Sequence, residues 1–166
     1  MTNVIEPRIL HLEEDVEMPN HPSFPVLIYA GVFAQDEAGM DRAFEERFAQ
    51  NGWRGIWRNG IFGYHHFHPD AHEALGVARG SAEVQLGGES GERLRIEVGD
   101  LLVLPAGTGH KRLSASADFL VVGAYPKGQE NYTILRSKVP RDVVAQVPRP
   151  RTDPFYGNDG PLLRLW

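Results

Sequence analysis

The sequence predicts an all-β fold, a small antiparallel barrel with one N-terminal α-helix packed outside it. From residue 53 onward, short apolar runs are punctuated by glycine, which is typical of strands joined by tight turns. Several of these runs alternate apolar and polar residues with a period of two, as half-buried strands do. Before residue 136, only the segment 36–50 has a helical period, because its apolar residues recur every four positions.

The N-terminal third is predicted to contain an extended arm, one strand and the helix. Residues 7–22 are polar, with three prolines and a run of acidic residues, and they favour the arm. The apolar segment Val26–Phe33 predicts the first strand. Met40, Phe44 and Phe48 form the apolar stripe of the helix, and we interpret this stripe as a packing surface.

The later strands differ in how many of their faces are apolar. The segments 82–86 and 94–98 alternate, which predicts strands with one buried face. Leu101–Leu104 and Phe119–Tyr125 are apolar throughout, as strands covered on both sides are. One side would be the barrel interior. The other side of Phe119–Tyr125 would contact either a second subunit or the N-terminal helix.

We expect the 166 residues to form a single domain, since a chain of this length normally builds one core. The barrel core would span about 53–126, with the arm, strand and helix in 1–52 and an extension in 127–166. The extension ends in an apolar group, which we expect to be packed because a loose apolar terminus would be costly. This group consists of Leu162, Leu163, Leu165 and Trp166. Together with the apolar strand, it leads us to expect a homodimer.

Composition and charge exclude several classes of function. The net charge of -5 comes from 17 basic and 22 acidic residues without a block of like charge, which argues against nucleic acid as a partner. No apolar run approaches the ~20 residues that span a bilayer, so we expect no membrane span. The absence of cysteine excludes disulfides, thiolate ligands and cysteine nucleophiles. An acidic N-terminal region without a signal pattern leads us to expect a cytoplasmic location.

Histidines are concentrated in one short segment. Four of the seven, His65, His66, His68 and His72, fall within eight residues. On an extended strand, His66 and His68 point to one side and His65 to the other, because side chains alternate. A register shift of one residue would exchange His65 for this pair. His72 alternates away and is expected to support the site or lie on the surface.

Two further residues complete a candidate metal site. Glu73 follows a turn at Pro69-Asp70 and begins the next strand, where it can lie beside His66 and His68. A turn at 105–107 directs His110 onto a following strand. Imidazole nitrogen and carboxylate oxygen are ligands for divalent transition metals. We therefore expect one such ion, iron, manganese, nickel or zinc, at these residues.

These residues resemble the two motifs of the cupin superfamily. The first motif, Gly-x5-His-x-His-x4-Glu-x6-Gly, is matched by Gly60, His66, His68, Glu73 and Gly80. The second motif, Gly-x5-Pro-x-Gly-x2-His-x3-Asn, is matched by Gly99, Pro105, Gly107 and His110. Ser114 replaces the final asparagine, which is not a metal ligand. The resemblance implies a double-stranded β-helix, the jelly-roll barrel of two packed sheets.

The chain ends resemble a narrower group, the small bacterial single-domain cupins of unassigned activity. The similarity lies in Tyr125-Pro-Lys-Gly-Gln, Asp153-Pro-Phe-Tyr-Gly and the closing Gly160-Pro-Leu-Leu-Arg-Leu-Trp. Membership in this group would imply the fold and the metal site without specifying a reaction.

Other side chains are candidates for the surroundings of the metal. Tyr64 and Phe62 share the parity of His66 and His68, so both would face the barrel interior. Tyr64 is the candidate catalytic residue because its hydroxyl can donate or accept a proton, with core packing as an equal alternative, whereas for Phe62 core packing is the favoured interpretation. Further candidates are Trp57, Arg54 and Arg58 as anchors for an anionic ligand, although tryptophan more often packs in a core and arginine more often lies on the surface. Tyr125 and Lys127 are candidates for the barrel mouth.

Two functions are consistent with these observations. A metal held by three histidines and one glutamate leaves open positions and can act as a Lewis acid. The first hypothesis is therefore a metal-dependent enzyme acting on a small molecule, dioxygenase-like with iron or isomerase- or lyase-like with manganese, nickel or zinc. The alternative is a non-catalytic module that binds a small molecule or a metal, since one fold hosts both kinds of protein.

Overall fold

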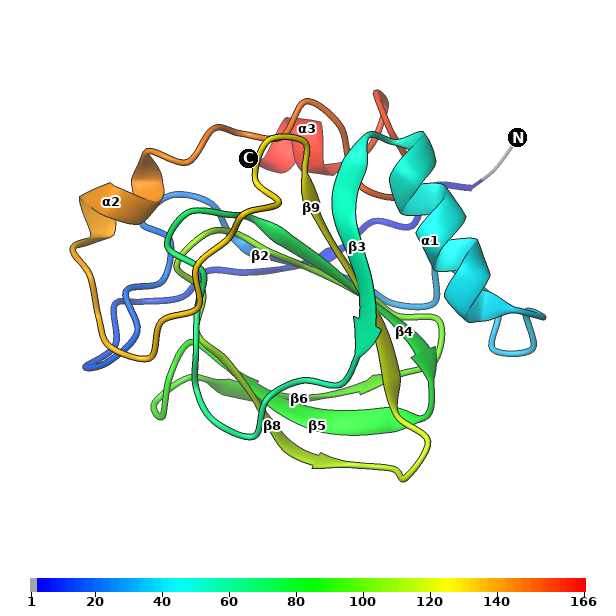
Figure 1. Ribbon diagram of the computed structural model, residues 1–166, viewed down its shortest axis with the longest axis horizontal. Helices are drawn as coiled ribbons and strands as arrows, with labels where there is room; N and C mark the ends of the chain where they lie inside the picture. Colours follow the sequence, from blue (N-terminus) through cyan, green and yellow to red (C-terminus); the bar gives the residue numbers. More distant parts are fainter. Residues whose placement is uncertain (1–2) are drawn as a thin grey trace.

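The computed structural model describes residues 3–166, and its strands form two antiparallel sheets that face each other as a barrel (Figure 1). The six-stranded sheet has the order β1 (Arg8–Leu10), β2 (Val26–Tyr29), β7 (Leu101–Leu104), β4 (Glu73–Arg79), β9 (Leu120–Pro126) and β3 (Trp53–Asn59). The three-stranded sheet has the order β6 (Glu92–Glu97), β5 (Ser81–Leu86) and β8 (His110–Ala115). The predicted all-β double-stranded β-helix is confirmed.

Apolar side chains from alternate strand positions fill the space between the sheets. From the larger sheet, β4 and β7 contribute Leu75, Val77, Leu102 and Leu104. From the smaller sheet, the cluster includes Ala82, Val84, Leu86 and Ile96. The period of two at 82–86, and at Leu94 and Ile96, therefore corresponds to one face inside the barrel, as predicted, whereas Val98 packs against the cluster that contains Phe44 and Phe48.

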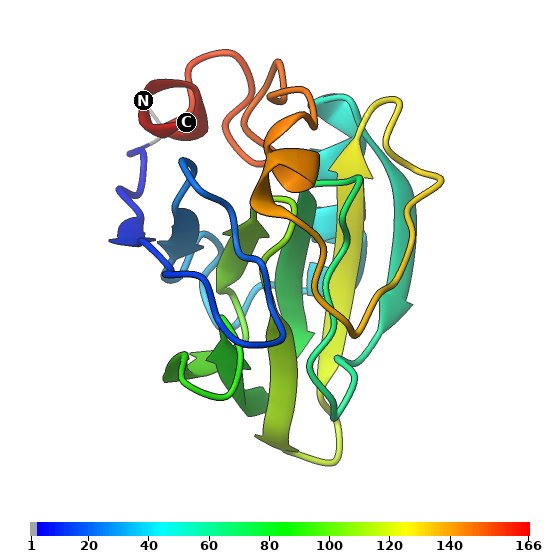
Figure 2. The ribbon, with the colours of Figure 1, turned by 90° about the vertical axis from the view of Figure 1, so that its left-hand side faces the viewer.

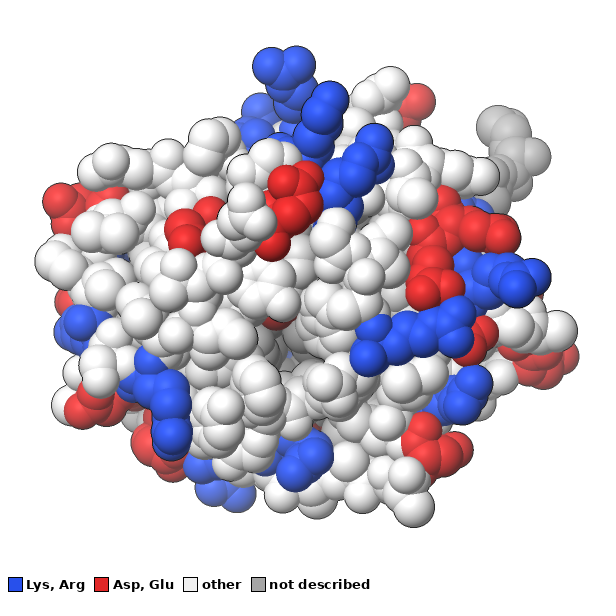
Figure 3. Space-filling view, viewed as in Figure 1, with Lys and Arg blue, Asp and Glu red and all other residues white. Residues whose placement is uncertain are grey.

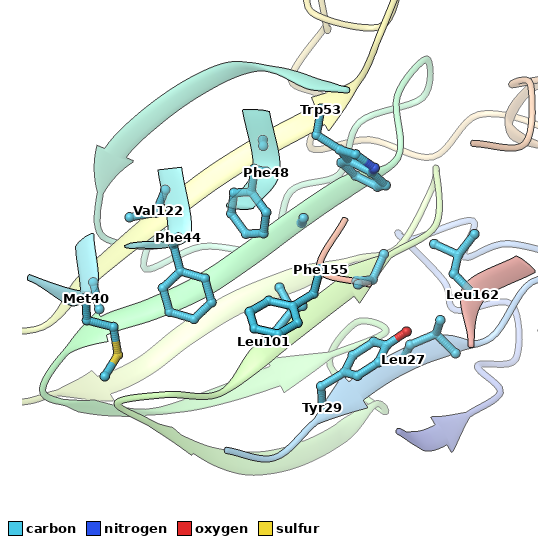
Figure 4. Packing of buried hydrophobic residues seen from close by; sticks show 14 residues of the cluster. Leu27, Tyr29, Met40, Phe44, Phe48, Trp53, Leu101, Val122, Phe155 and Leu162 are labelled. Atoms are coloured by element: carbon cyan, nitrogen blue, oxygen red, sulfur yellow. The ribbon is translucent and has the colours of Figure 1, made fainter. Parts of the chain in front are cut away.

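The outer face of the larger sheet is covered by the chain itself. Helix α1 (Met40–Gln50) lies across it, and Phe44 and Phe48 pack with Val122 and Ala124 of β9 (Figure 4). The predicted helix and its packing stripe are confirmed, and of the two alternatives for the outer side of β9 the helix is the correct one. The expectation of a homodimer thereby loses one of its two grounds and stays a prediction.

One glycine allows the helix to lie this close to the sheet. A Cβ atom at Gly76, in the middle of β4, would stand 2.5 Å from Cδ1 of Phe44. Because real Cβ atoms do not approach so closely, any larger residue at this position would push α1 away from β4.

The C-terminal extension packs against one end of the barrel, where residues 148–166 lie at the top in both Figure 1 and Figure 2. It contains α2 (Arg141–Ala145) and α3 (Leu162–Leu165), two helices too short to give a periodic signal in the sequence. Asp153 is fully buried and accepts hydrogen bonds from the hydroxyl of Tyr29 and the backbone N–H groups of Phe155 and Leu162. The apolar end is packed, as expected, which removes the second ground for a homodimer.

The last residue belongs to an aromatic stack. Trp166 donates from Nε1 to the carbonyl of Pro25 at 2.8 Å, and its ring stacks on Phe24 with 5.1 Å between centroids. Phe24 in turn stacks on His21 at 4.4 Å. Within residues 3–166, none of the helices is both long and apolar enough to cross a membrane.

The burial of His21 leads us to expect that the folded protein loses stability as the pH falls. Its side chain is 6% exposed, and Nδ1 accepts hydrogen bonds from the backbone N–H groups of Ser23 and Phe24. Burial, and then the positive charge of Arg141, lower the pKa of His21 to about 4. Because the unfolded chain has a higher pKa for this group, about 6.5, it binds the proton first as pH falls. The stabilising effect is therefore present above pH 6.5 and is lost towards pH 4.

We expect this one histidine to reduce the free energy of unfolding by roughly 2 kcal/mol between pH 7 and pH 5. His21→Asn keeps a hydrogen-bond acceptor but does not titrate, so its stability should depend less steeply on pH. Urea unfolding at both pH values measures the difference. Equal pH dependence in the wild type and the variant would contradict the assignment.

Candidate metal centre

The two histidines of the first motif lie between β3 and β4, in the segment 60–72. The expectation that they occupy a regular strand is wrong, because this segment forms only isolated bridges, His66 with His110 on one side and Phe67 with Leu135 on the other. Pro69 follows directly and has no N–H group with which to continue the pairing. The backbone is still extended enough locally for alternate side chains to share a side.

His66, His68 and His110 form a buried group that can hold a metal ion. Each offers a ring nitrogen, and these nitrogens lie within 4.8 Å of one another. Glu73, the first residue of β4, adds a carboxylate: its Oε2 lies 3.1 Å from Nε2 of His68 and its Oε1 lies 3.3 Å from Nε2 of His110. The structure thus brings together all four residues that the motifs predict as ligands. We call these four residues the ligand cluster.

Backbone carbonyls fix the orientation of the three imidazoles. Nδ1 of His66 lies 3.1 Å from the carbonyl oxygen of Tyr64, Nδ1 of His68 lies 2.8 Å from that of Thr133, and Nδ1 of His110 lies 2.9 Å from that of Thr108. A carbonyl can only accept, so each Nδ1 carries a hydrogen and donates it. In the neutral rings the lone pair is therefore on Nε2, the atom that faces Glu73 in His68 and His110.

The electrostatics of the cluster favour a cation. Burial opposes ionisation of Glu73, but the neighbouring His68 and His110 outweigh it and hold the pKa of Glu73 well below its usual range. Burial alone would lower the pKa of His68, but the charge of Glu73 outweighs it and raises that pKa. His66 is different, because burial and then the charge of His110 lower its pKa to about 3. A buried carboxylate beside the imidazoles of His68 and His110 is stabilised by a proton or a metal ion between them.

The donor set fits a divalent transition metal. An ion with bonds of ~2.1 Å holds neighbouring ligand atoms about 3.0 Å apart in an octahedral shell. The separations of 3.1 Å and 3.3 Å between Glu73 and the two imidazoles are close to that value. In addition, the buried Oε1 of Glu73 accepts no hydrogen bond from residues 3–166. A bound cation would satisfy this oxygen.

The ligand cluster lies in the wall of a cavity of about 420 Å³, and Figure 3 shows the hollow near the middle of the face where the barrel opens. Besides the cluster, apolar and aromatic side chains dominate the lining, with two arginines among them. These lining residues include Trp57, Arg58, Ile61, Phe62, Leu75, Arg112, Tyr125, Tyr132 and Ile134. Such a size and composition are typical of a small-molecule site.

Tyr125 is a tyrosine of the cavity wall that forms a hydrogen bond with the ligand cluster. Its hydroxyl donates to Oε2 of Glu73 at 2.7 Å and accepts from Nε1 of Trp57 at 2.8 Å. Burial, and then the charge of Glu73, raise the pKa of Tyr125, so its hydroxyl keeps its proton. The pairing of Ala74 with Ala124 explains the contact, because it places Tyr125 opposite Glu73 on the neighbouring strand.

Tyr64, the predicted catalytic residue, does not line the cavity. Its ring stacks on Phe62 with 4.9 Å between centroids, and the guanidinium of Arg136 lies 4.0 Å above it. A catalytic role for Tyr64 stays a prediction. The contact of Tyr125 with Glu73 follows from the register of β4 and β9. Sequence analysis could have found it only if the pairing of these two strands were known.

The remaining histidines of the crowded segment lie outside the cluster. His65 lies 3.1 Å from Glu89 through Nδ1 and accepts from the backbone N–H of Gly88 through Nε2. His72 is fully buried, and its Nδ1 accepts from the backbone N–H of Ala106 at 2.8 Å. Both rings are therefore held by partners of their own.

The fold and the site define the class of this protein, and comparison with known proteins agrees. The family described as Cupin domain matches residues 56–122. A curated relative, "Uncharacterized protein YjlB" of Bacillus subtilis (strain 168), is 39% identical over 158 residues, which cover 92% of each chain. The chain therefore belongs to the cupin family. The similarity to YjlB agrees with the prediction, made from the motifs near the C-terminus, that this chain belongs to the small bacterial cupins of unassigned activity.

The similarity to solved structures is more distant. Acireductone dioxygenase from Bacillus anthracis is 13% identical, with 63% of this chain and 79% of that chain covered and a TM-score of 0.45. ChmJ, a 3'-monoepimerase from Streptomyces bikiniensis, is 16% identical, with 64% and 66% covered and a TM-score of 0.40. Procruciferin from Brassica napus is 23% identical, and this chain spans 21% of its length, with a TM-score of 0.39.

Removing a ligand should abolish metal binding. We expect the protein, purified without a histidine tag, to contain about one equivalent of a transition metal, and we expect His110→Ala and Glu73→Ala to contain little, because each loses a ligand. His11→Ala, which removes an exposed imidazole, serves as the control. Plasma mass spectrometry measures the content. A wild type that neither contains metal nor takes up added ions would contradict the site.

Tyr125→Phe should weaken metal binding without removing a ligand. The variant keeps the ring but loses the hydrogen bond that orients Glu73, so we expect the affinity to fall about tenfold. Competition with a chromophoric chelator measures the change. Tyr64→Phe is the matched control and should bind as the wild type does. Equal affinities in all three proteins would show that the hydroxyl of Tyr125 does not orient Glu73.

Proposed function

We propose that this protein is a metal-dependent enzyme that acts on a small molecule bound in the cavity beside His66, His68, Glu73 and His110. One observation carries the proposal: the ligand cluster is buried yet belongs to the wall of an open cavity of about 420 Å³. Structural metal sites are closed by protein ligands, whereas catalytic sites keep a position for substrate or water. The location of the cluster supports the second type.

The side chains around the cluster have distinct roles in this proposal. The three imidazoles and Glu73 would hold the ion, which would supply Lewis acidity for an oxygen of the substrate. Tyr125 keeps its proton on Oη, directed at Glu73, and thereby fixes the carboxylate. Trp57 holds Tyr125 in place through its indole N–H. The apolar and aromatic walls exclude water from the bound molecule.

The identity of the metal would indicate the reaction. Iron would favour a dioxygenase-like activity, and manganese, nickel or zinc would favour an isomerase- or lyase-like activity. The ligand types suit each of these ions, since imidazole and carboxylate ligands do not discriminate strongly among them.

One observation favours the alternative, a module that binds a small molecule without transforming it. Apart from the ligand cluster, the side chains that line the cavity within residues 3–166 include no carboxylate and no histidine. A reaction that needs a separate general base would have to obtain it from the substrate or from water.

Metal reconstitution distinguishes the two functions. The metal-free protein is loaded separately with iron(II), manganese, nickel or zinc, and each form is incubated with small oxygen-rich molecules. Oxygen uptake and proton NMR follow any reaction. We expect turnover with one metal and none in His110→Ala. Ligand binding that is equally tight in metal-free protein, without turnover by any form, would favour the binding module.

A further inference from the structure

The two arginines that line the cavity differ in their salt bridges. Arg58 donates to Asp41 at 2.8 Å and to Glu45 at 2.6 Å, so two acidic side chains neutralise it. Glu73 belongs to the ligand cluster. Arg112, by contrast, forms no salt bridge with any residue in 3–166. The cavity therefore has one positive charge that no protein group compensates.

Strand register directs Arg112 to the same side as the metal ligand His110. The two residues are separated by two positions on β8, and side chains alternate along a strand. On β5 they lie opposite Val84 and Leu86, which belong to the apolar cluster inside the barrel. Residues directly opposite each other in an antiparallel pair project to the same face. Arg112 thus projects towards the interior from the rim.

A contact with Gly63 places the guanidinium of Arg112 at the cavity wall. A Cβ atom on Gly63 would lie 3.4 Å from Nη2 of Arg112, so the guanidinium lies against a residue that lines the cavity without a side chain of its own. The side chain remains exposed to solvent and is accessible to a ligand.

A β-bulge follows immediately. Glu83 pairs with Ser114 and Val84 with Arg112, so Leu113 has no partner on β5. Bulges often occur next to active sites, where they change the direction of a neighbouring side chain. Here the bulge lies directly after Arg112 on β8.

The cavity that contains this charge and the ligand cluster also has apolar walls. Ile61, Leu75 and Ile134 line the cavity, together with the ring of Phe62. A molecule that fits has an oxygen for the metal, a compact apolar body and a negatively charged group at the other end.

We propose that the substrate is a small organic carboxylate, held at the rim by Arg112 while its other end reaches the ligand cluster. The guanidinium presents paired N–H donors that match a carboxylate. This inference rests on the proposed function, because it needs the metal site to receive the far end of the molecule. It adds the chemical class of the ligand and the residue that selects it.

Two matched probes test the selection. 3,4-Dihydroxybenzoate and 3,4-dihydroxybenzamide have the same metal-chelating diol and differ in one distal group, a carboxylate or a neutral amide. Titration calorimetry measures the Kd of each with zinc-loaded protein, since zinc does not oxidise the diol. The proteins are the wild type, Arg112→Met, Arg112→Lys and the control Arg93→Met, which removes an exposed arginine from the same sheet.

We expect the wild type and Arg93→Met to bind the carboxylate about tenfold more tightly than the amide, as one charged hydrogen-bonded pair allows. In Arg112→Met the two Kd values should become equal through loss of carboxylate affinity alone, and Arg112→Lys should restore part of the preference. An unchanged preference in Arg112→Met, or no preference in the wild type, would overturn the inference.

The zinc content of each protein separates this inference from the proposed function. Stoichiometric zinc without a preference for the carboxylate overturns only the role of Arg112. A wild type that takes up no zinc overturns both. Thermal unfolding of Arg112→Met checks that the variant folds, and the amide probe, which should bind it as tightly as the wild type, shows that its cavity is intact.

Discussion

A carboxylate buried inside a β-barrel is the constraint on which the rest of the site depends. Glu73 is 3% exposed, and an uncompensated charge in such a place costs several kcal/mol. Its position leaves little choice about its neighbours. Tyr125 on one adjacent strand donates a hydrogen bond to the carboxylate, and the neighbouring His68 and His110 lower the pKa of Glu73. The burial of Glu73 and the capacity of the site to hold a metal therefore have the same physical cause.

The C-terminal extension contributes directly to this arrangement. His68 is oriented by the carbonyl of Thr133, and Thr133 is itself held by Asp70, which accepts from its backbone N–H at 2.9 Å and from its hydroxyl at 2.8 Å. Leu135 pairs with Phe67 between the two histidines of the first motif. The segment after β9 is thus part of the wall of the site, although it lies beyond the residues that match the cupin family.

The sequence was sufficient to predict those features that depend on local pattern. The spacing of His66, His68, Glu73 and His110 identified the residues that the structure brings together, and the stripe Met40, Phe44 and Phe48 identified the packed face of α1. Features that depend on pairing between distant strands were not predictable in the same way. The contact of Tyr125 with Glu73 and the bulge at Leu113 follow from register, which the sequence does not show. Helices as short as α2 and α3 leave no periodic signal.

The three hydrogen bonds from Nδ1 to backbone carbonyls affect how the site can evolve. In many metal sites a second carboxylate orients each histidine, and one substitution then removes that support. Here the acceptors are main-chain atoms of Tyr64, Thr108 and Thr133, which every replacement of those residues retains. The acceptor atoms of the imidazole N–H groups are therefore retained when these three residues are substituted. Side chains of the cavity wall other than Trp57 and Tyr125, which support Glu73, can therefore change the choice of ligand while these acceptors remain.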